Sequence, residues 1–237
     1  MNKLAIAAFA VAGLCGAVSA DVTSANVVGY QKSNSICGFN FLSPTFRTVG
    51  DDGVKLQAIK LVGDNVTEYA DNLQILDEGG AINENYYWQE CDGEYGWVIE
   101  NGSELSDRVI DKGVCVNIYT ENDDVEILFS GEVSSVGYSA TSICGFNFVG
   151  NSNPTSIDIQ DVKVLGDNVT EYADNLQILD EGGAILENYY WQEVDGTYGW
   201  VIENGDSLAS REIPAGLGFI VYTENDDVEI SIKGITL

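Results

Sequence analysis

The sequence contains no histidine in 237 residues, and this absence removes several classes of site. Ser–His and Cys–His nucleophilic pairs need an imidazole, and so do the usual zinc and copper centres. A phosphate-cradling glycine loop followed by Lys-Ser/Thr and a dinucleotide-binding fingerprint are also missing. With 38 Asp and Glu residues some carboxylate pair will lie at a glycosidase-like separation, so that signal carries no weight. We therefore expect a protein that is not an enzyme and binds no organic cofactor.

Basic residues are scarce, because 10 Lys and Arg stand against 38 Asp and Glu and give a formal net charge of −28. Phosphate binding needs clustered Lys or Arg, so we expect no nucleic-acid partner. Such a charge also repels itself, and salt or divalent cations should help the fold. We favour a solubilising acidic surface over calcium sites, because no acidic run has the ligand pattern of an EF-hand loop. The candidate calcium ligands are Asp51, Asp52, Asp123, Asp124, Asp226 and Asp227.

Long apolar runs are confined to the N-terminus. Residues 1–3 form a short, positively charged start, and residues 4–18 are apolar or small. Val18-Ser19-Ala20 then places small residues at the positions that signal peptidase recognises. This run is too short to cross a bilayer, so residues 1–20 are predicted to be a signal peptide cleaved before Asp21. We expect a secreted, extracellular or cell-surface protein that does not span a membrane, with the periplasm as an alternative.

One stretch of forty residues occurs twice. Residues 63–102 return as residues 166–205, and only Asn83/Leu186, Cys91/Val194 and Glu94/Thr197 differ, which leaves 37 identities in 40. An internal duplication follows. We expect repeat one at residues 21–133 and repeat two at residues 134–237, packed closely because no Pro- or Ser-rich linker separates them.

The pattern of apolar residues indicates strands throughout. Residues 82–91 and 94–100 flank Asp92-Gly93, a strong two-residue hairpin signal, and residues 73–77 precede them. Residues 114–120 and 125–130 are predicted to pair around the loop 121–124, and residues 54–61 to hold a short helical turn. Six to eight strands in about a hundred residues indicate an all-β fold, with two tandem β-sandwich, jelly-roll-like repeats.

The hairpin concentrates aromatic residues on one face. A two-residue turn pairs Cys91 with Glu94 and sets Trp88 opposite Trp97. Such a face suits a sugar-binding platform as well as a sandwich core, and Ile99 in the same row favours the core. The candidate platform residues are Tyr86, Trp88, Tyr95 and Trp97 in repeat one, and Tyr189, Trp191, Tyr198 and Trp200 in repeat two.

Four cysteines follow the predicted signal peptide. Cys91 and Cys115 both lack an equivalent in repeat two, where Val194 and Gly218 stand. Disulfide partners should be gained or lost together, so we predict a Cys91–Cys115 bridge in an exported protein. Cys37 and Cys144 are equivalent to each other, and we expect small buried thiols there, with a bridge between repeats or molecules as the alternative.

Several short motifs together resemble those of a known group of proteins. They are residues 26–30 (NVVGY), residues 36–41 (ICGFNF), the Tyr-Gly-Trp hairpin and residues 216–221 (GLGFIV). They resemble uncharacterised secreted β-repeat proteins of verrucomicrobial and planctomycete-type bacteria. The resemblance implies an exported β-rich surface or matrix protein, and it carries over no catalytic residue.

Two functions remain as expectations from the sequence. The first is a structural or interaction role at the cell surface or in extracellular matrix, with other surface proteins or further copies of the chain as partners. The alternative is a carbohydrate-binding module, in which polysaccharide packs on the aromatic hairpin faces. Exposure of the hairpin tryptophans distinguishes the two.

Overall fold

A computed structural model describes residues 28–49, 53–134, 136–180 and 182–235 of the chain. Throughout these residues the regular structure is β, interrupted only by two 3₁₀ turns, and the expected all-β fold is confirmed. One of those turns, η1 (Leu56–Ala58), lies in the stretch where a helical turn is predicted, and η2 (Ile159–Asp161) is its equivalent. The predicted signal peptide and the calcium candidates Asp51 and Asp52 lie outside the described residues.

Each repeat contains a five-stranded antiparallel sheet, which we call the large sheet. In repeat one its order is β2 (Gly38–Leu42), β10 (Val116–Thr120), β6 (Asn72–Leu76), β7 (Ile82–Cys91) and β8 (Glu94–Ile99). In repeat two its order is β13 (Gly145–Gly150), β20 (Gly218–Thr223), β16 (Asn175–Leu179), β17 (Ile185–Val194) and β18 (Thr197–Ile202).

A smaller sheet packs against each large sheet. In repeat one it contains β1 (Val28–Asn34), β11 (Glu126–Val133), β3 (Phe46–Arg47) and β5 (Ile59–Val62). In repeat two it contains β12 (Tyr138–Thr141), β21 (Glu229–Ile232) and β15 (Val162–Leu165). Two short pairs complete the set, β4 (Val54–Lys55) with β9 (Val109–Ile110), and β14 (Ile157–Asp158) with β19 (Glu212–Ile213).

The space between the two sheets of each repeat is filled by apolar side chains. In repeat one Leu73 and Ile118 of the large sheet meet Ile127 and Phe129 of β11, and all four are at most 1% exposed. Repeat two has its own cluster, which includes Leu176, Trp200, Phe219, Val221 and Ile230. Burial of this apolar surface is the main force that holds each sandwich together.

The chain passes from one sheet to the other at the acidic loop Glu121–Asp124. The predicted hairpin of residues 114–120 with 125–130 is therefore wrong, because β10 pairs with β2 and β6 while β11 pairs with β1, β3 and β5. Asp124 adopts φ +60° at this crossing. Alternating apolar residues identify both strands correctly but do not determine which strand is the neighbour.

The two repeats meet through reciprocal backbone contacts. Leu42 forms an isolated antiparallel β-bridge with Leu217, and the equivalent residues Val149 and Val114 form another. The amide of Ser43 donates to Gly216 O (2.9 Å), and the equivalent amide of Gly150 donates to Gly113 O (3.0 Å). Since each contact occurs twice with the roles of the repeats exchanged, the junction is a pseudo-two-fold interface within one chain.

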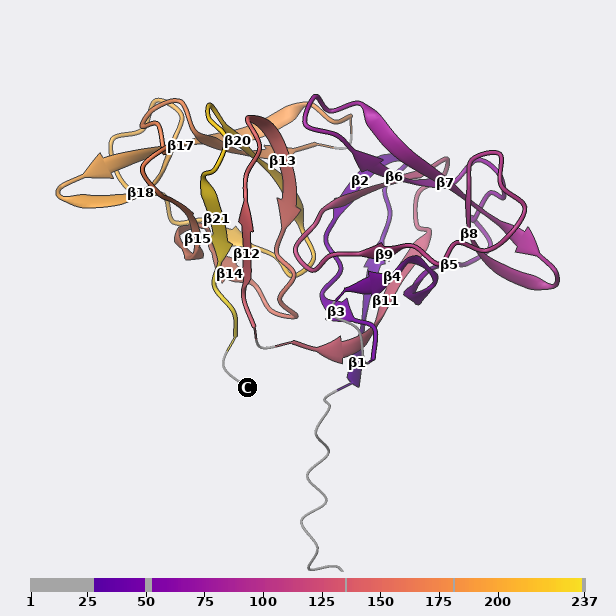
Figure 1. Cartoon of the computed structure of the whole chain (residues 1–237). Coiled ribbons are helices and arrows are strands. Elements are labelled where there is room, and N and C mark those ends of the chain that lie inside the picture. Colours follow the sequence, from indigo (N-terminus) through magenta and orange to yellow (C-terminus); the bar gives the residue numbers. More distant parts are fainter. Residues whose placement is uncertain (1–27, 50–52, 135, 181, 236–237) are drawn as a thin grey trace, which may run out of the picture.

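Figure 1 shows the consequence for the shape of the molecule. The large sheets form an upper layer that continues from repeat two to repeat one, with the smaller sheets below. The hairpins β7–β8 and β17–β18 project at opposite ends of this layer. Equivalent sites on the two hairpins therefore lie at opposite ends of the molecule.

Candidate functional site

The hairpin tryptophans lie in the core. Trp88 and Trp97 pair as the turn predicts, with ring centroids 5.1 Å apart in an edge-to-face arrangement, and they are 4% and 0% exposed. Trp97 Nε1 donates to Ile59 O of the smaller sheet (2.8 Å), and Trp200 repeats this bond to Val162. Tyr86, Tyr189 and Trp191 are also buried. A flat tryptophan platform is therefore not available to a polysaccharide.

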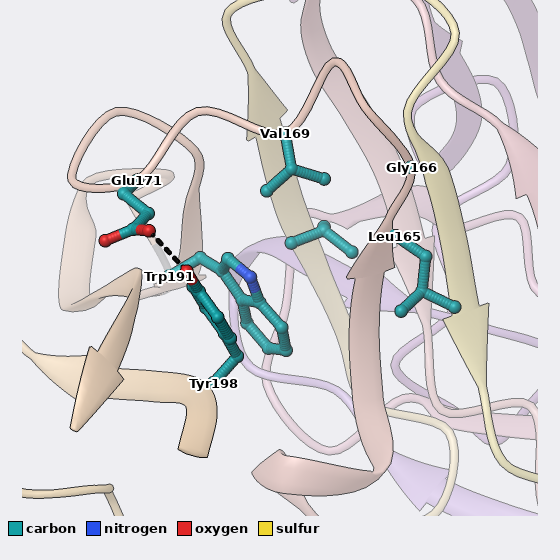
Figure 2. Close-up of a pocket in the computed structure, with 7 residues that line it drawn as sticks. Leu165, Gly166, Val169, Glu171, Trp191 and Tyr198 are labelled. Carbon is teal, nitrogen blue, oxygen red and sulfur yellow. Dashed lines mark hydrogen bonds between the residues drawn. The ribbon is translucent and has the colours of Figure 1, made fainter. Parts of the chain in front are cut away.

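Tyr95 and Tyr198 are the platform residues that reach solvent, each 46% exposed. In repeat two a shallow cavity of about 310 Å³ lies between Tyr198, Leu165 and Val169, with the edge of Trp191 at its floor. Figure 2 shows the Trp191 indole beside the Tyr198 ring, with Val169 and Leu165 on its far side. The cavity thus presents one exposed aromatic ring and apolar walls.

Charged groups frame this cavity. The Tyr198 hydroxyl donates to Glu171 Oε1 (2.7 Å), a bond that Figure 2 marks, and Tyr95 donates likewise to Glu68 (2.9 Å). This hydrogen bond to a carboxylate raises the pKa of Tyr198 to about 12, so the phenol stays protonated at neutral pH. The Lys163 ammonium lies 5.4 Å from the Trp191 ring centroid, within cation–π range.

A strained tyrosine follows each glutamate. Tyr69 and Tyr172 adopt φ +62° and +63°, and both side chains are 64% exposed. A positive φ is a true outlier for a bulky side chain and costs about 1–3 kcal/mol. The amide of Tyr69 donates to Trp88 O (3.0 Å), and that of Tyr172 donates to Trp191 O (3.0 Å). These bonds hold the backbone in place but give no reason for a tyrosine side chain.

A buried aspartate positions this loop. Asp71 is fully buried, and its carboxylate accepts from the amides of Thr67 (2.8 Å) and Glu121 (2.9 Å). Burial raises the pKa of Asp71 and of its equivalent Asp174, although the backbone hydrogen bonds oppose the shift. The loop is thereby fixed to the acidic crossing 121–124, and the strained tyrosine is held on a rigid base.

We call this assembly the tyrosine site, and the two repeats share it almost unchanged. Its members are Tyr69, Tyr95, Glu68, Trp88, Lys60 and Val62 in repeat one, and Tyr172, Tyr198, Glu171, Trp191, Lys163 and Leu165 in repeat two. By contrast, only Gln57/Gln160 and Lys60/Lys163 are identical between residues 54–62 and 157–165. Tyr69 and Tyr172 lie in the forty-residue block that recurs with 37 identities, so the duplication accounts for their identity. The positive φ at both tyrosines is the feature that packing does not explain.

A second surface, which no sequence pattern indicates, is the outer face of each large sheet. Val116 and Ile118 of β10 point into the core, so Asn117 and Tyr119 point outward. Strand pairing aligns two rows across this face, which we call the amide row and the tyrosine row. The amide row is Phe41, Asn117, Gln74 and Asn85, and the tyrosine row is Phe39, Tyr119, Asn72 and Tyr87.

Seven of these eight residues recur in repeat two. Asn117 is replaced by Ile220, whereas the other row members have identical equivalents in Phe148, Gln177, Asn188, Phe146, Tyr222, Asn175 and Tyr190. Phe39 and Tyr119 pack edge to face with centroids 5.6 Å apart, as Phe146 and Tyr222 do. Phe39 and Phe41 are apolar and alternate along β2 as core residues would, but they are only half-buried.

The remaining calcium candidates serve the backbone. Asp123 Oδ1 accepts from the Cys37 amide (2.7 Å), and Asp226 Oδ1 accepts from the Cys144 amide (2.7 Å). Asp124 and Asp227 occupy positive-φ positions in the same loops. Within the part of the chain that the structure describes, no group of three or more His, Cys, Asp or Glu side chains is arranged to hold a metal ion.

The predicted Cys91–Cys115 disulfide is wrong, and both thiols are free. Strand registers place Cys115 level with Leu76 and therefore with Ile82, at the far end of β7 from Cys91. Nine residues of strand separate them, roughly 30 Å at about 3.3 Å per residue, whereas a bridge needs Cα atoms within about 7 Å. Cys37 and Cys144 are also free, and they are exposed rather than buried as expected.

Comparison with known proteins gives no relative, because no protein-family model, no curated protein and no solved structure matches the chain. Among the described residues no helix is long and apolar enough to cross a bilayer. The evidence for function is therefore the tyrosine site and the outer face themselves.

Proposed function

We propose that the protein is a non-catalytic interaction protein, exported to the cell surface or the extracellular matrix, whose two tyrosine sites bind partners bivalently. The observation that carries this proposal is the pair of exposed, strained tyrosines, Tyr69 and Tyr172, present at equivalent positions. Strain at a solvent-exposed aromatic residue points to a binding role, because folding alone would favour Asn or Gly there. Tyrosine is also a residue that protein interfaces use preferentially.

The location of the sites supports bivalent binding. Each site lies beside a hairpin that projects from one end of the molecule (Figure 1). Two equivalent sites at opposite ends of one molecule can join two partners, or bind one extended surface with an avidity roughly 10²–10⁴ above a single site. If the two sites bind further copies of the chain, or other surface proteins, a cross-linked layer results.

The test replaces each strained tyrosine by asparagine, which tolerates positive φ and keeps the backbone hydrogen bond. Retention of the labelled protein by cells and matrix of the producing organism is measured for Tyr69→Asn, Tyr172→Asn and the double variant. Each single variant should lose part of the retention, and the double variant should lose roughly a hundredfold in apparent affinity. Tyr30→Asn, which changes an exposed tyrosine outside the sites, is the matched control.

Retention of the double variant at the wild-type level would overturn the proposal. Loss of retention in Tyr30→Asn as well would show that exposed tyrosines act nonspecifically, and would also count against it. The unfolding temperatures of Tyr69→Asn, Tyr172→Asn and the double variant should stay at or above that of the wild type, because asparagine tolerates the positive φ.

Carbohydrate binding is the second candidate function. The tryptophans that would form a sugar platform are buried, so the hairpin faces do not favour it. A different surface does, namely the outer face of the large sheet where the two repeats meet.

A further inference from the structure

A groove of about 350 Å³ lies on the outer face of repeat one, against repeat two. Phe39 and Phe41 of β2, Asn117 of β10 and Gln74 of β6 line it from one repeat. Gly182-Gly183 in the turn of the other repeat closes it. Its volume lies at the lower end of the range for small-ligand pockets. The groove is separate from both tyrosine sites and exists only because the repeats are joined.

The walls of the groove are aromatic. Phe39 and Phe41 have ring centroids 6.4 Å apart. A Cβ at Gly183 would lie 3.6 Å from Phe39 and 4.0 Å from Phe41, so the glycine leaves open the space that an alanine methyl group would fill beside both rings. Gly183 itself has φ +77°, a conformation that suits glycine. The rings offer flat apolar faces to a ligand that enters beside the turn.

An unpaired acceptor lies in the same groove. Asn117 is 3% exposed, and its Nδ2 donates to Gln74 Oε1 (2.7 Å). Gln74 Nε2 donates in turn to Asn72 Oδ1 (2.8 Å), and Asn72 Nδ2 donates to Ala70 O (2.8 Å). At the head of this chain of amides, Asn117 Oδ1 has no hydrogen-bond partner among the described residues. A buried acceptor without a donor lowers the stability of the fold. A chain of aligned amide hydrogen bonds polarises the acceptor at its end, so a donor placed there would bind more strongly.

Repeat two shows that the fold does not need this amide. Ile220 occupies the equivalent position. The other hydrogen bond between side-chain amides is kept in repeat two, where Gln177 Nε2 donates to Asn175 Oδ1 (2.7 Å). The amide at position 117 is therefore an addition to a sheet that folds with isoleucine there. A buried polar group that the fold does not require calls for an explanation, and a ligand that supplies a donor is one.

The chemistry of the groove selects an uncharged ligand. None of its lining residues is charged, and a chain of net charge −28 repels anions. We propose that the groove binds one pyranose unit of a neutral glycan. The C–H face of the sugar packs on Phe39 and Phe41, and one hydroxyl donates to Asn117 Oδ1.

The test is affinity electrophoresis of the full chain in gels that contain dextran, galactomannan, arabinoxylan or mixed-linkage β-glucan. Retardation is expected on at least one of them, and it should persist in 0.5 M NaCl, about the concentration that screens surface charge. Asn117→Ile, which installs the residue of repeat two, should weaken the association at least about tenfold, equivalent to one lost hydrogen bond. Ile220→Asn, the reciprocal change in the other repeat, is the matched control and should leave this association intact.

Unchanged tryptophan emission shows that each variant is folded. Absence of retardation on all four neutral polysaccharides would overturn the proposal, and so would equal weakening by Asn117→Ile and Ile220→Asn. Retardation that 0.5 M NaCl abolishes would mean charge-driven association and would also overturn the proposal. Since Tyr69→Asn and Tyr172→Asn leave the groove unaltered, failure here is distinguishable from failure of the bivalent sites.

Discussion

At the scale of single residues, the four described cysteines differ in what surrounds them. Cys37 and Cys144 are exposed at equivalent corners, and their Sγ atoms contact the carbonyl oxygens of Glu121 and Glu224 (both 3.1 Å). Cys91 lies at the end of a hairpin, where its Sγ contacts Ser103 O (3.0 Å). Cys115 is buried at the junction of the repeats. Cys91 and Cys115 thus lie in separate surroundings, and their joint absence from repeat two does not indicate a bond between them.

Reaction of the folded protein with a thiol reagent should follow this order. In the chain without residues 1–20, we expect the reagent to modify Cys37 and Cys144 rapidly in native buffer. We expect it to modify Cys115 only after the protein is unfolded. Burial raises the pKa of the Cys115 thiol, which leaves almost no thiolate, the reactive form, at neutral pH. Mass spectrometry of the digested protein checks both statements. A peptide that cross-links Cys91 to Cys115, or a lower unfolding temperature under reducing conditions, would contradict them.

At the scale of elements, the central hairpin was predictable because its turn fixes the register. Asp92 and Gly93 have φ +51° and +87°, as a two-residue turn with two positive φ values requires, and Asp195-Gly196 repeats this. Trp88 therefore pairs with Trp97 as the sequence indicates. The turn does not reveal which face is inward, because Tyr87 and Val98 make the opposite face apolar as well. That choice depends on strands from elsewhere in the chain.

Acrylamide quenching of tryptophan fluorescence tests this burial directly. All four tryptophans lie in the two hairpins and are at most 4% exposed. The folded chain should therefore emit at short wavelength and be weakly quenched, and unfolding should shift the emission to the red and raise the quenching. A neutral quencher is needed, since a net charge of −28 excludes iodide. Strong quenching of the folded protein would mean that the aromatic face is open to solvent.

The outer face could not be predicted from the sequence, for a related reason. Its amide row combines Phe41, Gln74, Asn85 and Asn117, which come from four strands. Only the sheet order β2-β10-β6-β7 brings them together, and no local pattern specifies that order. The groove further requires Gly183 from the other repeat, more than sixty positions along the chain. Phe39 and Phe41 are apolar although they lie on this outer face, and the turn of the neighbouring repeat lies beside both of them.

At the scale of the whole molecule, the junction resembles a homodimer interface whose halves have been joined in one chain. Residues near its pseudo-two-fold axis meet their own equivalents, and Cys115 contacts Gly218 in this way. In a symmetric dimer both positions would carry the same residue, and two side chains would compete for one space. Fusion removes that constraint, so one copy carries a thiol and the other makes room for it. The same freedom allows repeat one to carry Asn117 where repeat two carries Ile220.

Gly218→Ala tests this account of the junction. The added Cβ would lie 2.2 Å from Cys115 Sγ and 2.8 Å from the carbonyl carbon of Phe41, so the repeats must shift apart. Overpacking of this kind typically costs about 1–3 kcal/mol in the free energy of unfolding, which urea titration measures. Gly79→Ala, whose Cβ would meet only the Asp77 carboxylate at 3.4 Å, is the control and should change stability by less than about 0.5 kcal/mol.

The double variant Gly218→Ala/Cys115→Ala separates this cause from a general effect of alanine. Removal of the thiol relieves the shorter of the two contacts, so the double variant should lose less stability than the sum of the single losses. The contact with the Phe41 backbone remains, and recovery should therefore be partial. Strictly additive losses would show that Cys115 and Gly218 do not compete for the same space, and the asymmetry at the axis would then need another explanation.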